Sequence, residues 1–318
     1  MSYKISWLRW LIRIAGLFGL AYVLATADFA KLWFAIKNVN YFYLSIALMA
    51  AFGVNGFKGL RLYYMLGCLN LHYSAVDCVK TTFIANYLGA VTPGRIGELI
   101  QAGYLKDDAA IPFSVSLPVL IYLRLFDFYI VGMIVVIGLA TWEIDLLNRG
   151  LSLFLFPALA LSAGLIFIPK IFLRILQFVG KKSGQWDGIG EDTGNIILLC
   201  LKQIGFLLLL TVLLYVFLFG RCLCLSEGMD LPLSLPKLIF IISLVNIVSY
   251  LPISIAGLGT TQVALVFLFV REGITKEDAL IFSFLLFGVV YLWGILLGAL
   301  VWLNKSIKIR RSLPEEAR

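Results

Sequence analysis

Charged residues and histidine are scarce in this sequence, and their scarcity excludes several classes of protein. Only 14% of the 318 residues are charged and 61% are hydrophobic, whereas soluble domains have about a quarter charged residues. No polar block is long enough to fold as a soluble domain, so any chemistry must occur in the membrane or at its surface. His72 is the one histidine, and the five cysteines lack the paired spacing of metal ligands. We therefore expect no cofactor and no enzyme activity, because no set of nucleophile, base and metal ligands is visible.

Long apolar runs take the place of charge, and the mean hydropathy is +0.98. They predict an all-α polytopic membrane protein with about six spanning helices. The six runs are residues 14–27, 41–66, 111–140, 151–169, 203–224 and 275–303. Residues 29–39 and 171–179 carry apolar side chains at helical spacing among lysines and arginines, which is typical of helices that lie on a membrane surface.

The stretch Asn86–Ile100 interrupts this pattern with a proline, three glycines, an arginine and a glutamate. Proline and glycine both weaken a helix, so Pro93 and Gly94 predict a break. Irregular backbone in a bilayer is tolerated only where protein or a water-filled cavity satisfies it. Each half of the segment 78–105 is shorter than the about 20 residues that a span needs, so we expect a re-entrant hairpin.

A second stretch, Asn246–Gln262, follows the same plan. It too runs from an asparagine through about six residues to a proline, Pro252, and then through a glycine-rich turn into a polar helix start. Paired interrupted segments of this kind are the best sequence pointer to the binding site of a transporter. We therefore expect a second re-entrant broken-helix hairpin within residues 237–271.

The order span, span, hairpin, span occurs twice, in residues 1–140 and 151–304. Because the first copy starts inside and the second outside, we expect an inverted-topology repeat within one integral membrane domain, residues 1–318. Residues 305–318 then form a basic cytoplasmic tail. This topology puts about 18 of the 26 lysines and arginines on the side of both termini. The positive-inside rule makes that side cytoplasmic, predicts an inner (plasma) membrane location, and explains the net charge of +8 without nucleic acid as a partner.

The two broken tips supply most of the candidate substrate-binding residues. A helix that restarts after Gly94 exposes N–H groups which, together with Arg95, suit a phosphate or a carboxylate. Glu98 either neutralises Arg95 or takes up a proton as a coupling group. The alternative is that the glycines only allow the hairpins to pack tightly. The candidates are Asn86, Pro93, Gly94, Arg95, Gly97 and Glu98 at the first tip, and Gly257, Gly259, Thr260, Thr261 and Gln262 at the second.

Charged residues inside the predicted spans are further candidates. Arg124 and Asp127 share a helix face three residues apart, and either one alone would be costly in the membrane. They form a structural ion pair with each other or belong to the lipid pathway. Lys58 and Arg61, near the end of the 41–66 run, are expected to snorkel to the lipid headgroups, with a role at the site as the alternative.

Three motifs carry a resemblance to a known family. Residues 92–98, 124–127 and 251–259 resemble the lysylphosphatidylglycerol synthase transmembrane-region family, also called the flippase-like domain family, over almost the whole chain. The resemblance implies a flippase-like role, and stand-alone members of the family are tied to glycolipid or polyprenyl-linked glycan pathways. It implies no synthase activity, which belongs to a separate soluble aminoacyl-transfer domain. The family often has a glutamate where Gln262 stands, which leaves Glu98 as the one hairpin carboxylate.

The sequence thus predicts a protein that moves an anionic polar-headgroup lipid, a phospholipid or a polyprenyl-phosphate-linked lipid, between leaflets. One alternative is a non-transporting membrane partner of a lipid-modifying or glycosyl-transferring enzyme, and another is a small-solute secondary transporter. A packed core without a cavity would favour the first alternative, and a closed central cavity would favour the second.

Overall fold

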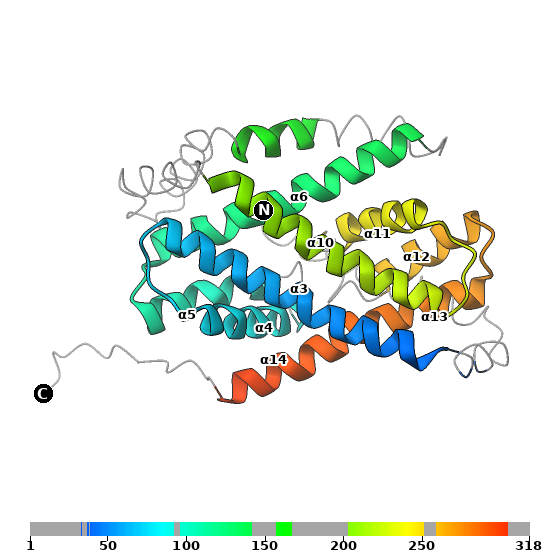
Figure 1. Cartoon of the computed structure of the whole chain (residues 1–318), viewed down its shortest axis with the longest axis horizontal. Helices are drawn as coiled ribbons and strands as arrows, with labels where there is room; N and C mark the ends of the chain where they lie inside the picture. The colour runs from blue at the N-terminus through cyan, green and yellow to red at the C-terminus, as the bar shows by residue number, and fades with distance from the viewer. Residues whose placement is uncertain are drawn as a thin grey trace, which may run out of the picture.

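Helices make up every regular element in the parts of the chain that the structure describes. The computed structural model describes residues 39–91, 96–141, 157–166, 203–250 and 259–304, together with Trp33 and Lys37. The first elements are α3 (Tyr41–Cys68), α4 (Ala75–Val91), η1 (Ile96–Leu99), α5 (Ile100–Ala109) and α6 (Phe113–Thr141). The later ones are α10 (Ile204–Glu227), α11 (Leu235–Tyr250), α12 (Thr260–Arg271), α13 (Lys276–Phe287), η3 (Gly288–Leu292) and α14 (Trp293–Asn304) (Figure 1). The predicted all-α fold is confirmed for these parts.

Three helices, α3, α6 and α10, are long and apolar enough to cross a membrane. They have 28, 29 and 24 residues, and a span needs about 20. α13, η3 and α14 follow one another without a break, where the sequence predicts another span. The predicted span 14–27, the surface helix 171–179 and the tail 305–318 lie outside the described residues, and 151–169 is described only at Pro157–Ile166. The count of six spans therefore stays a prediction.

Helices end on both sides of the two predicted breaks. α4 ends at Val91 and η1 begins at Ile96, so the first helix stops just before Pro93. α11 ends at Tyr250 and α12 begins at Thr260, on either side of the segment that holds Pro252. α4, α11 and α12 have 17, 16 and 12 residues, so each is shorter than a span. The re-entrant course of the two segments stays a prediction.

The turns that follow α3 and α10 are built alike. Asn70 and Asp230 both adopt left-handed backbone, with φ of 56° and 51°, a conformation that asparagine and aspartate tolerate better than most residues. The next residue in each turn, Leu71 or Leu231, donates its N–H to the carbonyl five residues earlier, at 2.9 and 3.0 Å. Corresponding residues of the two turns are 160 positions apart, which is what the predicted repeat requires; the repeat of the whole helical plan stays a prediction.

The last helix of each predicted copy packs against a helix of the other copy. α6 lies on α11, and α14 lies on α4. Both contacts are close at a glycine. A Cβ atom on Gly138 would lie 2.0 Å from the ring of Phe240, and one on Gly298 would lie 2.5 Å from the carbonyl oxygen of Phe83. Small residues let membrane helices approach in this way. The exchange is reciprocal, as a two-fold repeat requires; an inverted orientation of the copies stays a prediction.

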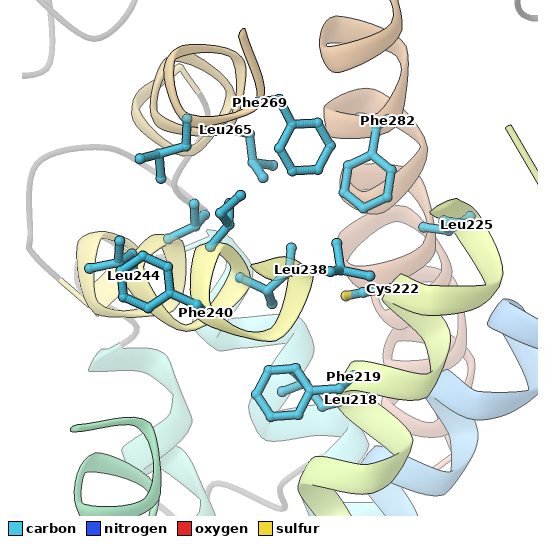
Figure 2. Close-up of a cluster of buried hydrophobic side chains, with 14 of the residues drawn as sticks. Leu218, Phe219, Cys222, Leu225, Leu238, Phe240, Leu244, Leu265, Phe269 and Phe282 are labelled. Carbon is cyan, nitrogen blue, oxygen red and sulfur yellow. The ribbon is translucent and has the colours of Figure 1, made fainter. Parts of the chain in front are cut away.

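Two apolar cores fill the described part of the molecule. The larger joins α10, α11, α12 and α13, and includes Leu238 and the rings of Phe269 and Phe282, whose centroids are 4.9 Å apart (Figure 2). The smaller contains Leu66 of α3, Phe126 of α6 and neighbouring residues of α5 and α10. Along each of the helices α3, α6 and α10, one stretch of residues belongs to the larger core and a separate stretch belongs to the smaller core. Three buried polar residues lie at that boundary: Arg61, Asp127 and Thr211.

Candidate functional site

A cavity of about 110 Å³, lined by apolar and by polar side chains, lies between helices of both predicted copies. It has room for several water molecules, since one water needs about 10–15 Å³ of such space. Five residues that the sequence proposed for the site line this cavity: Asn86, Glu98, Asp127, Thr261 and Gln262. A smaller cavity of about 60 Å³ shares Lys58, Asn86, Glu98 and Asp127 with the first, so the two adjoin.

Asp127 pairs with Arg61 of α3. Two guanidinium nitrogens of Arg61 donate to the two carboxylate oxygens at 2.7 and 2.9 Å, and one also donates to Oγ1 of Thr211 at 3.2 Å. The side chains are 4% and 11% exposed. A bidentate pair of this kind is the strongest geometry for these groups. The predicted Arg124–Asp127 pair and the predicted snorkelling of Arg61 are both wrong, because the adjacent helix α3 brings a guanidinium to both carboxylate oxygens at once.

Arg124 instead pairs with Glu98, at 2.6 Å between Nη2 and Oε2. This contact links η1, directly after the first break, to α6. Glu98 also lies over Gly89 of α4, where an added Cβ would come within 2.5 Å of Cγ of Glu98. The cation that we expected for Glu98 was Arg95, which lies outside the described residues; in the structure Arg124 neutralises this carboxylate.

Other residues of the first tip are described in part. Pro93, Gly94 and Arg95 lie outside the described residues, and Gly97 lies within η1. The amide nitrogen of Asn86 on α4 donates a hydrogen bond to Oδ1 of Asn55 on α3. Asn86 is thus tied to the neighbouring helix at the same time as it lines both cavities.

The second tip begins α12. Gly259 has a φ of 90°, in the region that favours glycine. Oε1 of Gln262 accepts the N–H of Gly259 at 2.8 Å and the hydroxyl of Thr261 at 3.1 Å. Gln262 therefore caps the start of α12, and it also lines the larger cavity. Thr260 is the first residue of α12, and Gly257 lies outside the described residues.

Comparison with known proteins identifies the family. Residues 10–298 match the family described as the lysylphosphatidylglycerol synthase TM region. The chain belongs to this family. The match covers both interrupted segments and every helix that lines the cavity, and it confirms the resemblance of the motifs. Neither the curated proteins nor the solved structures gave a match. Membership makes the chain a membrane protein of a family linked to the handling of anionic lipid.

Three cavity residues of this lysylphosphatidylglycerol synthase TM-region protein were missed as substrate-binding candidates: Arg221, Asn246 and Trp293. Lys58 also lines the cavity, as the alternative to snorkelling expected. Two of the three missed residues had a signal in the sequence. Arg221 and Asn246 stand 160 positions after Arg61 and Asn86, the same offset that relates the two turns. A comparison of the copies residue by residue would have found both. No pattern in the sequence distinguishes Trp293.

Positive charge is in excess around the two cavities. Four cationic side chains line them, namely Lys58, Arg61, Arg124 and Arg221. Only two carboxylates, Glu98 and Asp127, do so among the described residues. Guanidinium and ammonium groups are the side chains that proteins most often use to bind anions. The site of this family member is therefore suited to an anionic group.

Proposed function

We propose that this protein moves an anionic polar-headgroup lipid between leaflets, and the excess of positive charge around the cavities carries the proposal. Glu98 and Asp127 are each neutralised by an arginine. Lys58 and Arg221 add two further cationic side chains to the lining of the larger cavity. Guanidinium and ammonium groups are the protein's usual phosphate binders. A lipid phosphate in the cavity would lie among these cationic side chains.

The placement of the two broken segments supports the same function. Glu98 directly follows the first break and Thr261 follows the second, and both line the larger cavity. In transporters built from repeats, broken helices meet at the substrate site, and one repeat moves against the other. A headgroup that crosses the protein through this cavity would pass both tips, while the acyl chains stay in the lipid.

A carrier of small anions is the second candidate, because the cavity of about 110 Å³ holds a phosphate group more readily than a large headgroup. Both candidates need a polar space inside the protein. A non-transporting partner of another enzyme does not need one, so the cavity favours transport.

Transport of fluorescent lipids in proteoliposomes tests the proposal. Phosphatidylglycerol and phosphatidylcholine carry the same fluorophore on the acyl chain, and dithionite reports the fraction in the outer leaflet. We expect phosphatidylglycerol to exchange faster than phosphatidylcholine, and Lys58→Gln to slow it. The matched control is Lys237→Gln, since Lys237 pairs with Glu272 at 2.5 Å and lines neither cavity.

Exchange of phosphatidylglycerol at the rate of protein-free liposomes would contradict the proposal. So would equal exchange of both lipids. Uptake of inorganic phosphate by the same proteoliposomes, without lipid exchange, would instead support the small-anion carrier.

A further inference from the structure

The two copies use matched polar residues differently at the cavity. In the first copy, Asn86 donates its amide hydrogen to Asn55, and Arg61 binds the carboxylate of Asp127. The Asn86 amide and the terminal nitrogens of Arg61 therefore have partners within the chain, whereas Nε of Arg61 has none among the described residues. The matched residues of the second copy are Asn246 and Arg221, which also line the cavity.

The side-chain amide nitrogen of Asn246 is a buried hydrogen-bond donor. Within the described ranges of the chain, its amide nitrogen has no hydrogen-bond partner. Tyr215 stands where the first copy has Asn55, and the hydroxyl of Tyr215 donates to the carbonyl oxygen of Asp127 at 3.4 Å. The acceptor that serves Asn86 in the first copy thus has no counterpart for Asn246.

Trp293 has a second donor of this kind. Its indole nitrogen is buried and, like the Asn246 amide, meets no acceptor in the part of the chain that the structure describes. The π turn η3 directly precedes Trp293, and Val289 and Val290 from this turn line the same cavity. π turns inserted in α-helices are frequent at functional sites.

The carboxylate of Asp127 on α6 has no counterpart on α13, η3 or α14 in the second copy. Counted from the starts of α6 and α13, Asp127 corresponds to Val290. No aspartate or glutamate occurs from Ala279 to the end of α14 at Asn304. A buried donor that makes no hydrogen bond destabilises a protein. We therefore expect a ligand bound in the cavity to supply the acceptor for these donors.

We propose that Arg221, Asn246 and Trp293 bind a phosphate group in the larger cavity, an inference that rests on the function proposed above. The three side chains come from α10, α11 and α14, and all offer N–H donors. The non-bridging oxygens of a phosphate are acceptors only, and a guanidinium fork matches two of them. Arg221 is 9% exposed, so the charge contact would form away from bulk water. The ligand is a phosphate ester of a lipid or free phosphate, which share this chemistry.

Thermal unfolding in nanodiscs tests this subsite, with circular dichroism as the readout. Wild-type protein is compared in phosphatidylcholine alone, in phosphatidylcholine with phosphatidylglycerol, and in phosphatidylcholine with added inorganic phosphate. Asn246→Leu replaces one donor with an apolar side chain of about the same size, and Trp293→Phe removes the other donor and keeps an aromatic ring. Asn40→Leu is the control, because it breaks the hydrogen bond that Oδ1 of Asn40 accepts from the N–H of Phe42 at 3.0 Å, and Asn40 lines neither cavity.

We expect phosphatidylglycerol to raise the unfolding midpoint of the wild type. Asn246→Leu should unfold at or above the wild-type midpoint in phosphatidylcholine, whereas Trp293→Phe also leaves a void that lowers it. Both variants should lose most of the rise, with apparent affinity weakened by about tenfold or more. Asn40→Leu should lower the midpoint in every lipid and keep the rise. A rise with phosphatidylglycerol but not with inorganic phosphate assigns a lipid headgroup, and a rise with both assigns the phosphate group alone.

Two results separate the subsite from the function on which it rests. If no anion stabilises the wild type, the subsite and the proposed function both fail. If the wild type is stabilised and both donor variants keep the full rise, the subsite is overturned and the proposed function stands. Loss of stability by Asn246→Leu in phosphatidylcholine alone would also overturn the subsite, because its amide would then belong to the fold.

Discussion

The two copies of the repeat differ in where their buried polar groups find partners. In the first copy, the terminal nitrogens of Arg61 bind Asp127 and the amide of Asn86 binds Asn55, although Nε of Arg61 has no partner among the described residues. In the second copy, Asn246 at the matched position lines the cavity with an amide donor that no described residue accepts. The matched asparagines thus differ: the amide donor of Asn86 has an acceptor in the chain, and that of Asn246 has none among the described residues. We infer that the first copy supports the site and that the second receives the ligand.

The boundary between the two apolar cores explains how the site is held. Arg61, Asp127 and Thr211 come from three different long helices and bond to one another where the cores meet. Hydrogen bonds between buried groups of different helices fix the relative position of those helices. The bonds among these three residues therefore position α3, α6 and α10, the helices from which Lys58, Asp127 and Arg221 reach the cavity.

The largest expected effect comes from removing the cation of the first copy. Arg61→Leu leaves Asp127 buried without its guanidinium, and breaking such a pair costs about 3–5 kcal/mol. Arg221→Leu, the matched change in the second copy, should cost less, because Val290 rather than an aspartate occupies the corresponding position on the last helix. Unfolding free energies of both variants in phosphatidylcholine nanodiscs give the comparison.

The double variant Arg61→Leu/Asp127→Leu is the control for this pair. It removes both charges, and apolar replacement of a buried pair is often neutral. It should therefore recover most of the stability that Arg61→Leu loses. Equal losses in Arg61→Leu and Arg221→Leu would show that the two copies hold their arginines alike, and the contrast between them would fail.

A glycine of the first copy gives the next largest effect. A Cβ atom on Gly89 would lie 2.5 Å from Cγ of Glu98, so Gly89→Ala should displace the carboxylate that pairs with Arg124. Overpacking of this kind costs about 1–3 kcal/mol, and we expect slower lipid exchange as well. Gly103→Ala is the control, because nothing lies within 4 Å of its added Cβ. The second copy already has a side chain at the matched position, Ser249. Unchanged stability and exchange in Gly89→Ala would exclude a role for the fixed position of Glu98.

The sequence predicted the helix breaks better than it predicted the charge pairs. Proline and glycine act locally, so the ends of α4 and α11 could be placed beside Pro93 and Pro252. The pairing of Arg124 with Asp127 rested on spacing within one helix, but the partners come from α3 and η1. Which neighbouring helix approaches a charged side chain depends on packing, and a single sequence does not encode that packing in any local pattern. The donors of Asn246 and Trp293 could be identified only once the cavity was known.

The smallest effect concerns the second tip. Gln262→Leu removes the acceptor of the Gly259 N–H and of the Thr261 hydroxyl, and loss of a helix cap costs about 0.5–2 kcal/mol. The comparison residue in the first copy is Gln101 of α5, which lies one position before the residue that corresponds to Gln262, and its amide donates to Thr81 and Thr82 of α4 at 3.3 and 3.0 Å. Gln262→Leu should therefore speed hydrogen exchange at the start of α12, whereas Gln101→Leu should leave it unchanged.

Gln262→Glu sharpens this last comparison. A glutamate keeps an acceptor oxygen within reach of the Gly259 N–H, and a negative charge near a helix N-terminus is favourable. The cap should therefore survive, and exchange at the start of α12 should stay at the wild-type level. The added charge would, however, offset one of the cations around the cavity, so binding of phosphatidylglycerol should weaken while the fold is kept. Fast exchange in Gln262→Glu would show that the cap needs the amide, and unchanged lipid binding would show that the charge at this position does not reach the ligand.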